Sequence, residues 1–152
     1  MKEILADYNF TELKRLAEEM GERPFRAKQL FDGVMRGHDI SGIPALPAAF
    51  VQRLLGRFED CALKIVKTLT SSDGTEKYLY KLADGNIIEG VFMRYKYGNT
   101  LCVSTQAGCR MGCKFCASTL GGLVRNLTPG EMLSQVLKVN ALHGGTPAKR
   151  QV

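Results

Sequence analysis

The stretch TLCVSTQAGCRMGCKFCASTLGGLVRNLTPGEMLSQV, residues 100–136, decides the fold. It begins with TLCVST, a β-branched segment that predicts a short strand leading directly into a cysteine-rich loop. After the loop, Thr128, Pro129 and Glu131 supply an N-cap, a first-turn proline and a capping-box acid for a helix through about Leu142. Strand, loop and helix form one β-loop-α unit, in which α/β barrels carry their site residues. One unit is not a barrel, so we expect the first unit of an incomplete one.

Residues 1–60 show the apolar spacing of packed helices. We expect helices over residues 10–20, with Thr11 as N-cap, from Pro24 through FRAKQLFDGVM, and over residues 47–57. The expected core stripe of this part consists of large apolar side chains: Phe10, Leu13, Leu16, Phe25, Leu30 and Phe31. The sequence therefore predicts a small helical N-terminal domain.

From Cys61 the apolar period changes to two, which is typical of strands. LKIVKTLT, KYLYKL and NIIEGVFMRYKY are rich in Val, Ile, Leu and Tyr, and Asp73-Gly74 and Asp84-Gly85 supply the turns between them. We predict an α/β protein in which the helical domain is followed by a β-meander over residues 61–94. The first part of a barrel domain then occupies residues 95–152.

The net charge of +6 is concentrated in the second part of the chain. Residues 1–60 hold 9 Lys and Arg against 10 Asp and Glu, whereas residues 61–152 hold 12 against 5, which gives −1 and +7. A basic surface beside the cysteines suits a polyanionic partner such as RNA. Many basic proteins bind no nucleic acid, so charge alone leaves this open.

No segment has an apolar run long enough to cross a bilayer, and the N-terminus MKEILADYNF lacks a signal sequence. The five cysteines are odd in number and cluster around one loop. Such usage favours ligand or redox chemistry in a reducing compartment over a secreted disulfide scaffold. We therefore expect a cytoplasmic protein with no membrane partner.

Three cysteines stand in the spacing Cys109-x3-Cys113-x2-Cys116. Three thiolates would leave one iron of a 4Fe–4S cluster open to bind a small molecule, whereas four would give a closed electron carrier. Cys102 as a fourth ligand would give a ferredoxin-like carrier or a zinc-binding module, although the spacing lacks the paired C-x2-C of usual zinc sites. Both alternatives stay open at this point.

This spacing, with Phe115 before the last cysteine, resembles the signature of the radical S-adenosylmethionine (SAM) superfamily. More narrowly, residues 74–136, from GTEKYLYKL to EMLSQV, resemble the bacterial dual-specificity 23S ribosomal RNA and transfer RNA adenine-C2 methyltransferases, and FRAKQLF resembles a segment of their N-terminal domain. The related enzymes that methylate C8 of the ribosomal adenine have a similar cluster region. The resemblance identifies the chain as the N-terminal part of a C2-type protein.

The resemblance implies a 4Fe–4S cluster held by Cys109, Cys113 and Cys116, with SAM at the open iron. In the family, reductive cleavage of SAM gives a 5′-deoxyadenosyl radical, which takes hydrogen from a methylated cysteine. The resulting carbon radical adds to C2 of adenine and leaves an enzyme–RNA adduct. The electron would come from a donor such as flavodoxin or ferredoxin, and the full-length protein is expected to be a monomer.

Residue roles follow from the same resemblance. Glu89 matches the family's proton acceptor, and Cys102 matches the thiol that releases the adduct by attacking its sulfur, which would leave a disulfide bond. Phe115, Gly121 and Gly122 are expected near the bound cofactor, since glycines let a ligand approach the backbone closely. The methyl-carrying cysteine has no counterpart up to residue 152, so we expect the chain alone to be inactive.

Overall fold

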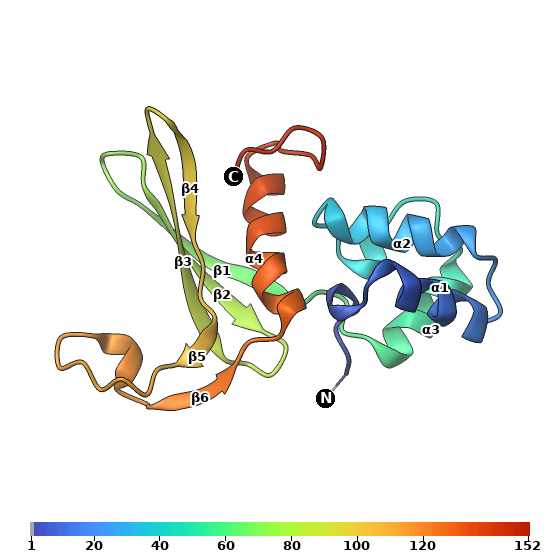
Figure 1. Ribbon diagram of the computed structural model, residues 1–152, viewed down its shortest axis with the longest axis horizontal. Helices are drawn as coiled ribbons and strands as arrows, with labels where there is room; N and C mark the ends of the chain where they lie inside the picture. Colours follow the sequence, from blue (N-terminus) through green and yellow to red (C-terminus); the bar gives the residue numbers. More distant parts are fainter. Residues whose placement is uncertain (1) are drawn as a thin grey trace.

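The computed structural model describes residues 2–152 and contains a helical body, a four-stranded sheet and a helix that stands between them (Figure 1). The helical body comprises single turns at Leu5–Asp7 and Ile40–Gly42 and three helices, α1 (Phe10–Glu19), α2 (Phe25–Met35) and α3 (Ala48–Arg57). Its core is a continuous cluster of buried side chains that includes Leu13, Leu16, Leu30, Phe50, Leu54 and Phe58. The predicted helical N-terminal part is confirmed.

Two details of this body differ from the sequence prediction. The N-cap of α1 is Asn9 and not Thr11, because Asn9 and Glu12 form a reciprocal capping box with bonds of 3.0 and 2.7 Å. Phe10 and Phe25 were expected in the core but are 38% and 51% exposed. Both begin their helices at the edge of the body, where the Phe25 ring lies 4.7 Å from the Arg26 guanidinium.

The meander forms an antiparallel sheet in the order β1-β2-β3-β4. Its strands are β1 (Leu63–Thr70), β2 (Glu76–Leu82), β3 (Ile87–Tyr95) and β4 (Gly98–Cys102). One face buries Tyr78, Tyr80, Ile88 and Phe92. The other face carries exposed and half-exposed residues, as the period of two requires.

The segment TLCVST does not form one continuous strand, so the strand that leads into the cysteine loop begins later than expected. Its first residues belong to β4, which pairs with β3 and is the edge of the sheet. The chain then turns at Val103–Thr105 into β5 (Gln106–Gly108), which pairs with β6 (Leu123–Asn126) on the far side of the cysteine loop. The cysteines therefore lie in the connection of a small two-stranded ribbon that precedes the helix.

The helix after the loop, α4 (Pro129–Leu142), agrees with the prediction in its bounds and in its Thr128–Glu131 capping box. It stands between the sheet and the helical body (Figure 1). Its Gly130 amide donates to the Asp7 carboxylate at 2.6 Å, and Lys138 pairs with Asp39. Helix α4 is therefore the element that joins the two bodies.

Candidate functional site

The cysteine loop is closed at its base by backbone contacts. The Cys109 amide donates to the Gly122 carbonyl at 3.0 Å, and the Cys116 amide donates to the Cys113 carbonyl at 3.0 Å. Gly108 has a φ of +72°, and a Cβ there would lie 2.0 Å from the Gly122 oxygen. Only glycine fits this position, so Gly108 and Gly122 together bring the two ends of the loop into register.

The thiols of the loop are half-buried, and all five cysteines of the chain are free. The disulfide bond that the resemblance implied therefore has no counterpart among these cysteines. Three free thiols on one short loop are a chemically suitable donor set for an iron–sulfur cluster. The geometry, however, is not that of a formed centre: within residues 2–152 no three His, Cys, Asp or Glu side chains gather as metal ligands.

A hollow of about 740 Å³ lies between the open face of the sheet and the cysteine loop. Glu89 of β3, Cys102 of β4 and Cys116 of the loop all line it. Val91 lies opposite Cys102 in the β3–β4 register, and it shares a face with Glu89 two residues earlier. The sheet thus brings two predicted site residues beside one of the three loop cysteines.

The side chains of Glu89 and Cys102 are exposed, and hydrogen bonds hold the backbone that carries them. The Ser104 hydroxyl donates to the Glu89 carbonyl at 2.7 Å. Gln135 of α4, which is fully buried, accepts from the Ser104 amide at 2.9 Å and donates to the Ser104 carbonyl at 2.8 Å. The strand that bears Glu89 and the segment after Cys102 are in this way attached to α4.

Arg125 of β6 anchors the other side of the loop. Its guanidinium makes two 2.7 Å bonds to the buried Glu131 carboxylate and one 2.6 Å bond to Asp84. The bonds that Arg125 donates to Glu131 and Asp84 raise its pKa well above the usual range of an arginine. Burial is the largest single influence and acts to raise the pKa of Asp84, but the bonds from Arg125 and Asn86 together outweigh it and hold that pKa below its ordinary value.

The three residues expected near the cofactor lie in different settings. Phe115 lines the hollow and is 95% exposed, so its ring is an uncovered apolar surface on the loop. Gly122 has a φ of +67° and closes the loop through its carbonyl. Gly121 has open space around its backbone, and neither glycine lines the hollow.

Sequence reasoning missed four residues that shape this site: Lys77, Gly108, Arg125 and Gln135. Gly108 stands directly before the first loop cysteine, and a glycine at that position is a signal that two backbone segments approach each other closely. The other three are polar residues inside a strand or a helix, and nothing in the local pattern shows what they contact.

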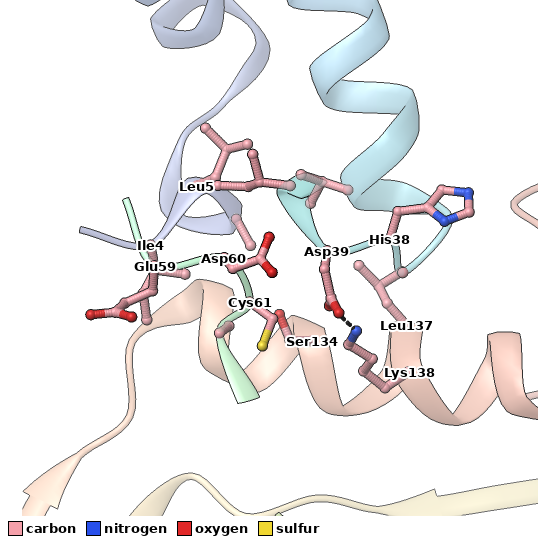
Figure 2. Close-up of a pocket in the computed structure, with 15 residues that line it drawn as sticks. Ile4, Leu5, His38, Asp39, Glu59, Asp60, Cys61, Ser134, Leu137 and Lys138 are labelled. Carbon is pink, nitrogen blue, oxygen red and sulfur yellow. Dashed lines mark hydrogen bonds and ion pairs between the residues drawn. The ribbon is translucent and has the colours of Figure 1, made fainter. Parts of the chain in front are cut away.

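A second, much smaller cavity lies at the junction of α4 with the helical body (Figure 2). Its volume is about 30 Å³, room for about one water molecule. Cys61 points toward Ser134 beside the Asp39–Lys138 ion pair, and burial raises the pKa of its thiol. A thiol with a raised pKa is a poor nucleophile. The small volume and the position of the cavity between α4 and the helical body are those of a packing gap.

Comparison with known proteins gives relatives for nearly the whole chain. No protein-family model matches. Curated proteins named as probable dual-specificity RNA methyltransferases (RlmN) are similar to it: one from Clostridium acetobutylicum is 51% identical over 138 residues, which is 90% of this chain and 40% of the relative. Another, from Clostridium perfringens strain 13, is 53% identical over 140 residues, again 90% of this chain and 40% of the relative.

A crystal structure of a radical SAM methyltransferase from Sphaerobacter thermophilus is similar in fold, with a TM-score of 0.86 and 35% identity. The match covers 99% of this chain and 44% of that one. The fold is therefore like that of part of a radical SAM methyltransferase. The chain is similar to these dual-specificity RNA methyltransferases over nine tenths of its own length, and it spans about two fifths of the length of the curated relatives it matches.

Among residues 2–152, no helix is both long and apolar enough to span a bilayer.

Proposed function

We propose that the chain is part of an enzyme that places a methyl group on C2 of adenine in 23S ribosomal RNA and transfer RNA. The observation that carries the proposal is the shared hollow, in which Glu89, Cys102 and Cys116 come together from two strands and a loop. The chemistry needs a base, a thiol and a cluster ligand near one substrate carbon. The names of the relatives give the reaction class.

Cys109, Cys113 and Cys116 would hold a 4Fe–4S cluster with one open iron, and Phe115, Gly121 and Gly122 lie on the same loop, where SAM would bind. The bound cluster and SAM supply the radical that activates an otherwise unreactive methyl group. The chain's own contribution is the closed loop base at Gly108 and Gly122. The Arg125 contacts fix the strand that leaves the loop.

Glu89 and Cys102 would resolve the adduct between enzyme and RNA. Radical addition leaves one unpaired electron on the adduct, which the cluster would take back. Glu89 would take the C2 proton, and the electron pair of the broken C–H bond would restore the aromatic ring. Cys102 then attacks the crosslinked sulfur, so that a sulfur–sulfur bond forms while the carbon–sulfur bond breaks. Cys102 loses its thiol proton when it attacks, and the carbon released from sulfur takes up one proton to become the methyl group, so that the protons balance.

The partners follow from charge and chemistry. Residues 61–152 carry +7 and contain the hollow, which suits RNA phosphates, and residues 1–60 would form a domain that assists RNA binding. The meander of residues 61–94 would link this domain to the catalytic part that starts near residue 95. Flavodoxin or ferredoxin would deliver the electron to a monomeric enzyme in the cytoplasm, whose reducing conditions suit five free thiols.

A crosslinking experiment tests this function. A full-length protein that contains residues 1–152 is incubated anaerobically with SAM, reductant and protein-free ribosomal RNA. We expect Cys102→Ala to accumulate protein covalently joined to RNA on a denaturing gel, while Cys61→Ala, a matched cysteine outside the hollow, turns over without an adduct. Digestion of the product separates 2-methyladenosine from 8-methyladenosine. Turnover of Cys102→Ala at the wild-type rate would contradict the role of the thiol, and 8-methyladenosine would contradict the C2 assignment.

A further inference from the structure

Lys77 of β2 makes a direct ion pair with Glu89, in which the Nζ atom lies 2.9 Å from Oε1. Lys77 pairs with Val91 in the β2–β3 register, so it is the diagonal neighbour of Glu89 on the open face of the sheet. It also lines the hollow, together with Glu89 and Cys102. The ammonium group is therefore part of the same wall as the proposed base and thiol.

The ion pair is not needed to hold the fold. The side chains of Lys77 and Glu89 are 41% and 49% exposed, and exposed ion pairs contribute little to stability. Among residues 2–152, Lys77 is the one cation within ion-pair distance of Glu89. Lys67 offers a comparison. It is an exposed lysine on the same face of the sheet, where it lies opposite Leu79. In the part of the chain described, it does not line this hollow and does not pair with a carboxylate.

We propose that Lys77 is a positioning residue for the proton acceptor Glu89, an inference that rests on the proposed function. The ammonium group binds Oε1 and so favours one orientation of the exposed carboxylate, which leaves Oε2 free to accept the proton from C2. It also compensates the charge of Glu89. An uncompensated carboxylate in the wall of the hollow would repel the phosphates of an approaching RNA.

Two effects follow from this arrangement. Loss of the ammonium should slow proton removal, so that the enzyme–RNA adduct accumulates. It should also weaken RNA binding, and this effect should be largest at low ionic strength because screening reduces repulsion. Neither effect is expected if the lysine serves only the packing of the sheet.

The experiment compares Lys77→Met, Lys77→Arg, Glu89→Gln, the double variant Lys77→Met/Glu89→Gln, and the control Lys67→Met in the full-length protein. The measurements are kcat and KM for RNA methylation at two salt concentrations and the fraction of crosslinked RNA. Iron content and RNA-independent SAM cleavage verify that each variant is folded and loaded. We expect Lys77→Met to lower kcat about tenfold and to accumulate adduct, as Glu89→Gln does. Lys77→Arg should restore most of the rate, and Lys67→Met should behave as wild type.

The double variant tests whether Lys77 acts through Glu89 or independently of it. If Lys77 acts through Glu89, Lys77→Met causes no further loss of kcat in the Glu89→Gln background. Adduct with Glu89→Gln but a wild-type kcat for Lys77→Met would overturn the role of Lys77 and leave the proposed function intact. Absence of adduct with Glu89→Gln would instead remove the proposed role of Glu89 and, with it, the role of Lys77.

Discussion

Gln135 has no access to solvent, and both ends of its amide are used by the backbone of Ser104. We expect Gln135→Leu to lower the free energy of unfolding by ~2 kcal/mol, because it leaves the half-buried backbone amide and carbonyl of Ser104 without their partner. The measurement is urea denaturation. Gln52→Leu, an exposed change of the same kind on α3, should shift stability by less than ~0.5 kcal/mol. Equal effects of the two changes would mean that the Ser104 contacts contribute nothing.

At the scale of residues, sequence reasoning found the side chains whose chemistry is specific and missed those whose role depends on contacts. Cysteine spacing is local, so the loop could be recognised from residues 109–116. The role of Gln135 could not be predicted, because a glutamine in a helix is usually solvated and only the folded chain places it against Ser104. The exposure of Phe25 was missed for the same reason, since its position at the edge of the body is set by packing.

At the scale of elements, the contact of α4 with the helical body depends on two glycines. A Cβ at Gly130 would lie 2.7 Å from backbone atoms of Ala6 and Asp7, and one at Gly37 would lie 2.9 Å from the Leu137 oxygen. Backbone atoms cannot move aside as a flexible side chain can. The two bodies therefore approach each other as closely as these glycines allow.

We expect Gly130→Ala to lower the free energy of unfolding by ~1–3 kcal/mol through this clash. Gly56→Ala in α3 is the matched control, because a Cβ there meets no atom within 4 Å and alanine favours a helix. It should raise stability by ~0.4–1 kcal/mol. Chemical denaturation of both variants measures the difference, and a stabilising effect of Gly130→Ala would rule out the close contact.

The bounds of α4 could be predicted because its capping box is a local signal, and the same is true of the turns at Asp73-Gly74 and Asp84-Gly85. The division of TLCVST between β4 and the following turn could not. Its β-branched residues favour an extended chain throughout, and the bend after Cys102 is held by the contacts of Ser104 with Glu89 and Gln135. Those contacts come from distant parts of the sequence.

At the scale of the whole molecule, the chain corresponds to about two fifths of the length of its relatives. The proposed reaction needs a cysteine that carries the methyl group, and Cys61, the one cysteine without a proposed role, lies outside the hollow. We therefore expect the 152-residue chain alone to form no 2-methyladenine. Mass spectrometry of RNA after anaerobic incubation measures this, with the Clostridium acetobutylicum relative as a positive control. Comparable product from both proteins would show that the chain suffices.

The central claim is that three loop cysteines, and not Cys102, hold a cluster with an open iron. Wild type and the variants Cys102→Ala, Cys109→Ala, Cys113→Ala and Cys116→Ala are reconstituted anaerobically with iron and sulfide, and the paramagnetic resonance of the reduced cluster is recorded before and after SAM is added. We predict that the three loop variants lose the cluster and that wild type and Cys102→Ala keep it, with a spectrum that changes on SAM binding. Loss of the cluster in Cys102→Ala, or a spectrum that SAM leaves unchanged, would contradict the claim and favour a closed electron-carrier site.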